Sequence, residues 1–388
     1  MTASATRPAP SGFEDVDGGS DFGRISLQEM STRLCGSADL FATEPGRGAP
    51  ASINFVSCHD GFTLTDLTRY RSKHNEANGE NNNDGSSVNH SANFGVEGVT
   101  DDPDVIAARE QAAMNMIGML LLSLGTPMML AGDEFRNTQD GNNNAYCQDN
   151  DITWLKWDWM YSTNKTREMR RLETVSRLVA LRKSLDLYHH EDFFTRLTQL
   201  GLLKPSSRVQ WFLPDGTTPM ERDWFDLGVR SFTMRLLSNS EVDVCIVVNG
   251  TADDRTFRLP PDTHWTPKWC SAEINGRRAG HGTQVEECDL NGDTTVWTQH
   301  VPDASETVLK MVKEVAMQRT ESSTENEADT IKFAMPVTDH AANGTSSAPR
   351  DEVSADMPDA PVDDTPDTPV DDNVWTMPAL SITLMKQV

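Results

Sequence analysis

Two acidic motifs at the ends of short apolar runs are the first candidates for chemistry. His59 and Asp60 follow residues 53–58, a mostly apolar and β-prone run that fits a buried strand. Asp133 follows a second such run at residues 127–131. In parallel barrels the functional side chains lie at the carboxyl ends of strands, which favours a functional role for these carboxylates. The alternatives are a turn cap for the His-Asp pair and a structural salt bridge for Asp133.

Two asparagine-rich stretches follow these motifs, and both are candidates for binding sugars. The first lies in a long polar loop at about residues 61–100, and the second includes Asn142. Amide groups both donate and accept hydrogen bonds, which suits the hydroxyl groups of a carbohydrate. Asparagine also tolerates left-handed backbone conformations and forms turns, so a structural role is the alternative for each of them. Loops of this length are either functional or unstructured.

The elements that position these residues follow a strand–helix–strand order. Asp101 or Asp102 can cap a helix, Pro103 suits its first turn, and Gly125 can end it. The second half of this helix is apolar almost all round, which predicts burial. Strand, helix and strand with acidic residues at the strand ends is typical of a parallel barrel or a doubly wound sheet. Residues 166–185 then predict an amphipathic outer helix.

From about residue 205 the pattern changes to short apolar runs separated by turns. The turn at Pro214-Asp215-Gly216 is one example. This texture predicts a separate antiparallel β domain. The expected strands cover residues 209–213, 231–237, 242–248, 255–259 and 294–298, with a closing strand at 374–384.

The expected domain boundaries follow these changes of texture. Residues 1–24 are rich in Gly, Ser, Pro and Asp and are predicted to be a disordered lead-in. Residues 25–204 hold the strand–helix–strand part, and residues 205–388 form the β domain. An acidic, proline-bearing insertion at about residues 320–373 cannot bury a core, so we predict that it is disordered.

The composition excludes several classes of partner. A net charge of −25, from 34 Lys and Arg against 59 Asp and Glu, argues against nucleic acid and membrane, which need clustered cations. A neutral polysaccharide is compatible. The six scattered cysteines lack metal-ligand spacing and no EF-hand pattern is present, so we predict no metal and no cofactor. The first ten residues hold no apolar signal region, and we predict a cytoplasmic protein.

Several motifs resemble those of one known family, the α-amylase superfamily (glycoside hydrolase family 13), and within it the isoamylase and bacterial glycogen-debranching branch. The resemblance is close from about residue 21 to residue 159 and weaker through the β domain. The segments that carry it are residues 33–40 (RLCGSADL), 55–64 (FVSCHDGFTL), 73–85 (KHNEANGENNNDG), 132–135 (GDEF) and 138–150 (TQDGNNNAYCQDN).

This resemblance implies hydrolysis of α-1,6-glucosidic branch linkages in glycogen or limit dextrin. The family uses an Asp nucleophile and a Glu acid/base, which lie about 5–5.5 Å apart in retaining enzymes. Asp60 matches a third carboxylate that stabilises the oxocarbenium-like sugar, and His59 matches a histidine that binds hydroxyls of the same sugar. Asp133 and Asn142 are candidate substrate-binding residues. The implied fold is the last two strands of a (β/α)8 barrel, with their helices, followed by an antiparallel β-sandwich.

The chain also departs from the family pattern. The nucleophile normally lies in a Gly-Phe-Arg-x-Asp strand upstream of the His-Asp pair, and its only echo here, GFED at residues 12–15, lacks the Arg. We therefore expect the chain to be inactive alone, with glycogen or another branched α-glucan as one partner and a separate N-terminal half as a second candidate partner. The alternatives are a non-catalytic glycan-binding fragment and a scaffold pseudoenzyme whose acidic tract recruits a partner.

Overall fold

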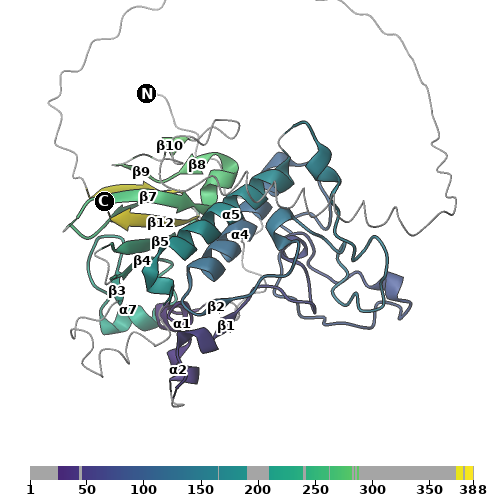
Figure 1. Ribbon diagram of the computed structural model, residues 1–388, viewed down its shortest axis with the longest axis horizontal. Helices are drawn as coiled ribbons and strands as arrows, with labels where there is room; N and C mark the ends of the chain where they lie inside the picture. The colour runs from purple at the N-terminus through teal and green to yellow at the C-terminus, as the bar shows by residue number, and fades with distance from the viewer. Residues whose placement is uncertain are drawn as a thin grey trace, which may run out of the picture. The chain divides into compact units, whose positions relative to one another are not determined.

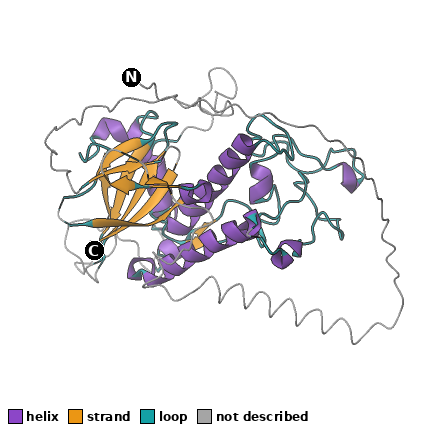
Figure 2. Ribbon diagram, turned by 90° about the horizontal axis from the view of Figure 1, so that it is seen from above, coloured by secondary structure: helices purple, strands orange, loops and turns teal. Residues whose placement is uncertain are grey.

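The computed structural model describes most of the chain outside its acidic insertion. The described residues are 25–42, 46–164, 166–189, 209–238, 242–261, 263–281, 284, 286–287, 373–378 and 381–387. The predicted lead-in at residues 1–24, the strand at 294–298 and nearly all of the insertion at about 320–373 lie outside them. All of the described residues belong to one structural unit, in which two long helices lie beside the β-strands (Figures 1 and 2).

A short parallel pair of strands carries the first candidate site. β1 (Ile53–Asn54) pairs with β2 (Thr126–Pro127), and α4 (Pro103–Leu122) connects them, which confirms the predicted strand–helix–strand order. Asp102 caps α4 by accepting a hydrogen bond of 2.9 Å from the backbone N–H of Asp104. Both strands are shorter than predicted. Among the described residues each strand pairs only with the other, so nothing extends the ladder beyond two residues.

The predicted amphipathic helix is α5 (Arg167–Ser184), which packs against α4. Thr166 caps its start with its side chain. Arg182 in its last turn donates hydrogen bonds to three backbone carbonyls at and just after the end of α4. The acceptors are Leu121 (2.6 Å), Ser123 (2.7 Å) and Gly125 (2.8 Å). Carbonyls at a helix end lack partners within the helix, so Arg182 supplies the missing cap from a neighbouring element.

The later part of the described chain is antiparallel β-structure, as the sequence predicts. The larger sheet has the order β3 (Val209–Phe212), β4 (Ser231–Leu236), β5 (Val244–Asn249), β12 (Ser381–Gln387) and β7 (Trp265–Cys270). A second sheet has the order β6 (Arg255–Arg258), β11 (Val374–Met377) and β9 (Gly280–His281), and β8 (Arg277–Arg278) pairs with β10 (Glu286–Glu287).

The sequence did not predict β7 but did predict the closing strand of the β domain. β7 contains Pro267, which an edge strand tolerates because no N–H group is needed on its open side. The predicted closing strand is present as β11 and β12, and β12 lies between β5 and β7 in the larger sheet.

The remaining described elements are short. They are α1 (Leu27–Leu34), α2 (Ala38–Phe41), α3 (Leu64–Leu67), α7 (Glu221–Phe225) and the 3₁₀ helices at Ala49–Ala51, Glu76–Asn78, Asp133–Phe135, Asp158–Tyr161, Asp186–His189 and Ser271–Asn275.

A common apolar core joins the helices to the larger sheet. Trp269 of β7 is fully buried against α4, and a Cβ atom at Gly118 would lie 2.9 Å from its ring. Glycine at this position therefore lets the helix approach the sheet closely. α4 is long and apolar enough to cross a membrane, but 61% of its most apolar window is buried inside this core. On the opposite face of β5, Cys245 and Val247 pack into a second cluster with Phe257 of β6.

Candidate functional site

His59 and Asp60 lie in the loop directly after β1, at its carboxyl end. The Nε2 atom of His59 is 3.3 Å from the Oδ2 atom of Asp60. Both side chains are open to solvent, with 86% of the His59 side chain and 77% of the Asp60 side chain exposed. The pair therefore presents a carboxylate and an imidazole side by side on the surface, where a sugar could reach both.

Asp133 holds this loop in place through hydrogen bonds. It is buried, and its two carboxylate oxygens accept hydrogen bonds from the Ser57 hydroxyl and from the backbone N–H of Leu64 (3.0 Å). Burial raises the pKa of Asp133 to about 6, against the effect of these hydrogen bonds. Because Ser57 and Leu64 flank the His59–Asp60 pair, Asp133 is placed to position that pair.

Asn142 is also buried and bonded within the protein. Its amide nitrogen donates to Oδ1 of Asn78 (2.8 Å), and its Oδ1 accepts from the backbone N–H of Asn144 (2.9 Å). The next residue, Asn143, accepts a hydrogen bond of 3.0 Å from the N–H of Gly61 through its backbone carbonyl. The structure thus brings the Asn142 loop against the residue that follows Asp60.

The two asparagine-rich stretches bind each other. The amide of Asn75 donates to Oδ1 of Asn143 (2.9 Å), and its Oδ1 accepts from the Asn143 backbone N–H (3.0 Å). Asp84 accepts from Asn78 (2.6 Å) and Asn144 (3.0 Å). These amides therefore build a rigid loop pair rather than isolated turns, because most of these bonds join residues that are far apart in sequence.

Two acidic residues that hold the site were not singled out from the sequence. Asp66 in α3 is fully buried and accepts hydrogen bonds from the Thr138 hydroxyl and the Gln139 backbone N–H (2.8 Å), so it joins α3 to the second loop. Burial raises its pKa. An acidic residue between the apolar residues Leu64 and Leu67 of α3 was the signal that could have identified it. Glu97 carried no such signal.

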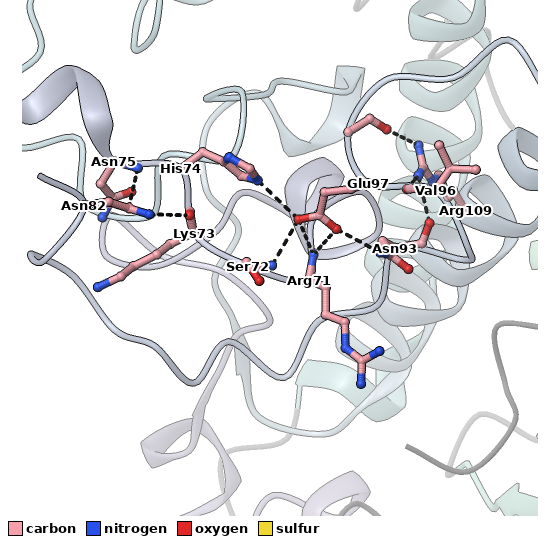
Figure 3. Close-up of polar contacts among 11 residues, drawn as sticks. Arg71, Ser72, Lys73, His74, Asn75, Asn82, Asn93, Val96, Glu97 and Arg109 are labelled. Atoms are coloured by element: carbon pink, nitrogen blue, oxygen red, sulfur yellow. Dashed lines mark hydrogen bonds and ion pairs between the residues drawn. The ribbon is translucent and has the colours of Figure 1, made fainter. Parts of the chain in front are cut away.

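Glu97 organises the first asparagine-rich loop (Figure 3). Its carboxylate accepts hydrogen bonds from the backbone N–H groups of Arg71 (2.9 Å) and Ser72 (3.1 Å) and from the Asn93 amide (2.8 Å). Nε2 of His74 lies 3.2 Å away. Burial alone would raise the pKa of Glu97, but these hydrogen bonds lower it to about 2.

Removing the Glu97 charge should destabilise this loop in a pH-dependent way. Its folded pKa lies below the unfolded value, so its contribution is present above the unfolded pKa and disappears as the pH falls toward 2. The side chain is 36% exposed, so we expect Glu97→Gln to lower the free energy of unfolding by about 1–2 kcal/mol at pH 7. Urea denaturation at pH 7 and pH 3 measures this.

Glu76→Gln is the matched control, because Glu76 is exposed in the same loop and has no side-chain partner among the described residues. The difference between Glu97→Gln and the natural chain should shrink at pH 3. An equal difference at both pH values would show that the charge of Glu97 is not what stabilises the loop.

An apolar groove of about 600 Å³ runs beside β1 and α4. Its lining includes Met30 of α1, Phe55 after β1, and Met116 and Met119 of α4. Phe55 is 53% exposed and Ile53 is 60% exposed. Apolar surface thus lies open next to the strand that carries the candidate site.

The chain shares clear sequence similarity with curated proteins. It is 44% identical over 213 residues to the glycogen operon protein GlgX homolog of Mycobacterium tuberculosis, covering 53% of this chain and 28% of that protein. It is 37% identical over 270 residues to the glycogen debranching enzyme of Pectobacterium atrosepticum, covering 69% of this chain and 38% of that enzyme. The chain is homologous to bacterial glycogen-debranching enzymes. It spans about a third of the length of these debranching relatives.

The similarity to solved structures is weaker than the sequence similarity to these debranching relatives. Pullulanase from Bacillus acidopullulyticus matches with a TM-score of 0.40 at 18% identity, covering 68% of this chain and 24% of that one. An Anoxybacillus pullulanase complexed with maltotetraose matches with a TM-score of 0.39 at 17% identity, covering 66% and 27%. No family model matches the chain. The relationship to debranching enzymes therefore rests on the sequence matches.

Proposed function

We propose that the chain forms the part of a glycogen-debranching active site that holds the sugar at an α-1,6 branch. The similarity to a curated debranching enzyme over 69% of the chain carries this proposal. The position of His59 and Asp60 directly after β1 supports it, because functional groups of parallel barrels lie at that end of the strands. The substrate would be glycogen or another branched α-glucan in the cytoplasm.

In finer detail, we propose that β1 and β2 belong to a (β/α)8 barrel, as its last two strands. The barrel part would cover residues 25–204, and the antiparallel sheets within residues 205–388 would form a β-sandwich domain. The parallel register of β1 and β2 and the long connecting α4 support this assignment, since parallel strands need a crossover connection.

Asp60 would stabilise the positive charge that develops on the sugar, and His59 would bind a hydroxyl of the same sugar. A carboxylate aimed at developing positive charge acts more strongly on the transition state than on the ground state. Asp133 and Asn142, which the sequence suggested as direct ligands, would serve the same subsite by holding its loops. Their polar atoms already bind protein partners, which supports this indirect role.

The exposure of Asp60 supports the proposal that further polypeptide covers the site. The interaction energy of two unit charges is about four times smaller in bulk water than near a protein surface. In an enclosed site the interaction is stronger again. The apolar groove beside β1 offers a surface on which additional barrel strands could pack. We therefore propose that further barrel strands, which carry the nucleophile and the acid/base, pack on this surface.

Exposed aromatic side chains favour a second candidate function, glycan binding without cleavage. Tyr146 is 73% exposed, Trp154 is 55% exposed and Trp157 is 37% exposed, all within or just after the second asparagine-rich loop. The flat apolar face of such rings can pack on a sugar while their polar atoms remain in water.

Two measurements test the debranching proposal. The purified 388-residue chain should release no reducing ends from amylopectin. Co-expression with the part of the Mycobacterium tuberculosis relative outside its 213 matched residues should yield a complex that hydrolyses α-1,6 branches. Debranching by the isolated chain would contradict the need for a second polypeptide. A stable complex that binds amylopectin in affinity electrophoresis but does not cleave it would favour the glycan-binding function instead.

A further inference from the structure

A small polar cavity of about 150 Å³ lies apart from the His59–Asp60 pair, and its lining includes four arginines. Arg69 follows α3, Arg109 belongs to α4, Arg136 follows the loop after β2, and Arg167 begins α5. Three threonines complete much of the wall: Thr65, Thr68 and Thr100. Four segments that are distant in sequence thus bring guanidinium groups to one place.

In the lining of this cavity, which we call the arginine cavity, basic residues outnumber acidic ones. The lining includes four arginines and two acidic residues, Asp101 and Glu110. Glu110 is already engaged, because Arg136 binds one of its oxygens at 2.9 Å and Arg171, outside the lining, binds the other at 2.8 Å. In a chain with a net charge of −25, this local excess of positive charge is unusual and needs a reason.

Two of the guanidinium groups are unoccupied. Arg69 and Arg167 make no side-chain hydrogen bond or ion pair with any residue that the structure describes. Arg167 is exposed and Arg69 is partly exposed, so a small solute can reach them. Their donors are available for a ligand at no cost in existing contacts.

The guanidinium groups of Arg109 and Arg136 are buried. Their protein partners hold them in place without fully neutralising their charge. Arg109 donates to the backbone carbonyls of Gly98 (2.6 Å), Asn93 (2.8 Å) and Val96, so its partners are dipoles and not carboxylates (Figure 3). Its Nε atom is buried and has no hydrogen-bond acceptor among the described residues. Such a group is costly unless an anion compensates its charge.

Arg136 shows the same imbalance. Burial lowers its pKa to about 10, Glu110 and Glu168 oppose this only in part, and the positive charges of Arg171 and Arg69 lower it further. The carboxylate of Glu168 lies 3.7 Å from Nε of Arg136, beyond hydrogen-bond distance. Its backbone is in the left-handed region at φ 70°, and its Nε atom also lacks a hydrogen-bond acceptor among the described residues. This left-handed conformation ends the 3₁₀ helix Asp133–Phe135, directly before the segment that binds Thr63.

We propose that the arginine cavity binds a tetrahedral oxyanion of the phosphate class, as a free ion or as the phosphate of a monoester. Planar guanidinium groups bind phosphate oxygens in pairs, and threonine hydroxyls add donors that turn freely. A volume of 150 Å³ corresponds to about five water molecules, at roughly 30 Å³ each, which accommodates one such anion. A divalent cation is excluded by the charge, and a neutral sugar would leave the guanidinium groups without a counter-charge.

A bound oxyanion would clamp the two loops that hold the candidate site. Arg69 lies just after α3, whose capping residue Thr63 donates a hydrogen bond of 3.0 Å to the backbone carbonyl of Asn137. Asn137 directly follows Arg136. An anion that bridges Arg69 and Arg136 therefore joins the same two segments from the other end, which makes the oxyanion a candidate effector of that site.

The test measures binding of inorganic phosphate and of a hexose phosphate to the whole 388-residue chain by isothermal titration calorimetry and thermal shift. Chloride at matched ionic strength and the unphosphorylated hexose are the solute controls. We expect phosphate to raise the melting temperature, and Arg69→Gln and Arg167→Gln each to weaken its binding by about tenfold or more, since each loses a charge-assisted contact. Arg71→Gln and Arg170→Gln, neighbours outside the lining, should bind phosphate normally.

The ligand series separates the two sources of phosphate. Equal affinity for inorganic phosphate and the hexose phosphate supports a site for the free ion, whereas tighter binding of the hexose phosphate supports a site for the monoester. Stabilisation no greater than that by chloride would overturn the proposal. So would equal losses in the lining variants and their neighbour controls, because binding would then follow overall charge. Arg69 and Arg167 make no side-chain hydrogen bond within the described part of the chain, and circular dichroism would check that their variants fold.

Discussion

The Asp60→Asn variant, assayed in a complex with the remainder of a debranching relative, should lower kcat by about 10²-fold or more and change KM little. The substitution keeps the size of the side chain and its hydrogen-bonding oxygen and removes only the charge. That charge matters mainly once the sugar becomes cationic, so its loss should appear in kcat. Initial rates of reducing-end release from a defined branched oligosaccharide measure both constants.

Two comparisons isolate the role of Asp60. His59→Ala should affect kcat and KM more evenly, because a hydroxyl contact exists already in the ground state. Asp253→Asn removes an exposed carboxylate from the turn after β5 and should leave the rate unchanged. If the complex is active and Asp60→Asn retains its kcat, Asp60 is not the stabilising carboxylate. In the isolated chain the Asp60 substitution should make no difference, since no cleavage is expected.

The largest expected effect on stability is that of Arg171→Leu. Arg171 is 1% exposed and donates to Glu110 at 2.8 Å and to the Thr65 hydroxyl at 3.2 Å. Burial would raise the pKa of Glu110, and the charges of Arg171 and Arg136 lower it. Removing Arg171 leaves a buried carboxylate with one of its two cationic partners, which should cost about 3–5 kcal/mol of unfolding free energy. Urea denaturation at pH 7 and 25 °C measures the loss.

Arg177→Leu is the control on the same helix. Its guanidinium pairs with Glu273 at 2.9 Å, but the two side chains are 27% and 20% exposed, so its loss should cost about 1 kcal/mol or less. The double variant Arg171→Leu, Glu110→Leu should recover part of the stability, because no buried charge is left unpaired. Equal losses of unfolding free energy in Arg171→Leu and Arg177→Leu would show that the buried Arg171–Glu110 pair contributes no more than the partly exposed Arg177–Glu273 pair.

Several features follow from the sequence because their causes are local. The cap at Asp102 depends on neighbours within one helical turn, and α4 begins where this residue predicts. The alternating apolar runs of β4, β5 and β12 likewise predict strands. The His59–Asp60 motif and the asparagine-rich stretches are contiguous segments, so the amino-acid sequence alone indicates the relationship to debranching enzymes.

Only the tertiary structure decided how the polar residues pair. Asp133 holds Ser57 across 76 positions of sequence, and Asn75 binds Asn143 across 68, so no local pattern reveals these contacts. The arginine cavity likewise needs α3, α4 and α5 to meet before its charges become neighbours. A motif identifies which residues are available for chemistry. Burial and packing between distant segments determine which of them face solvent, as Asp60 does, and which hold the loops, as Asp133 does.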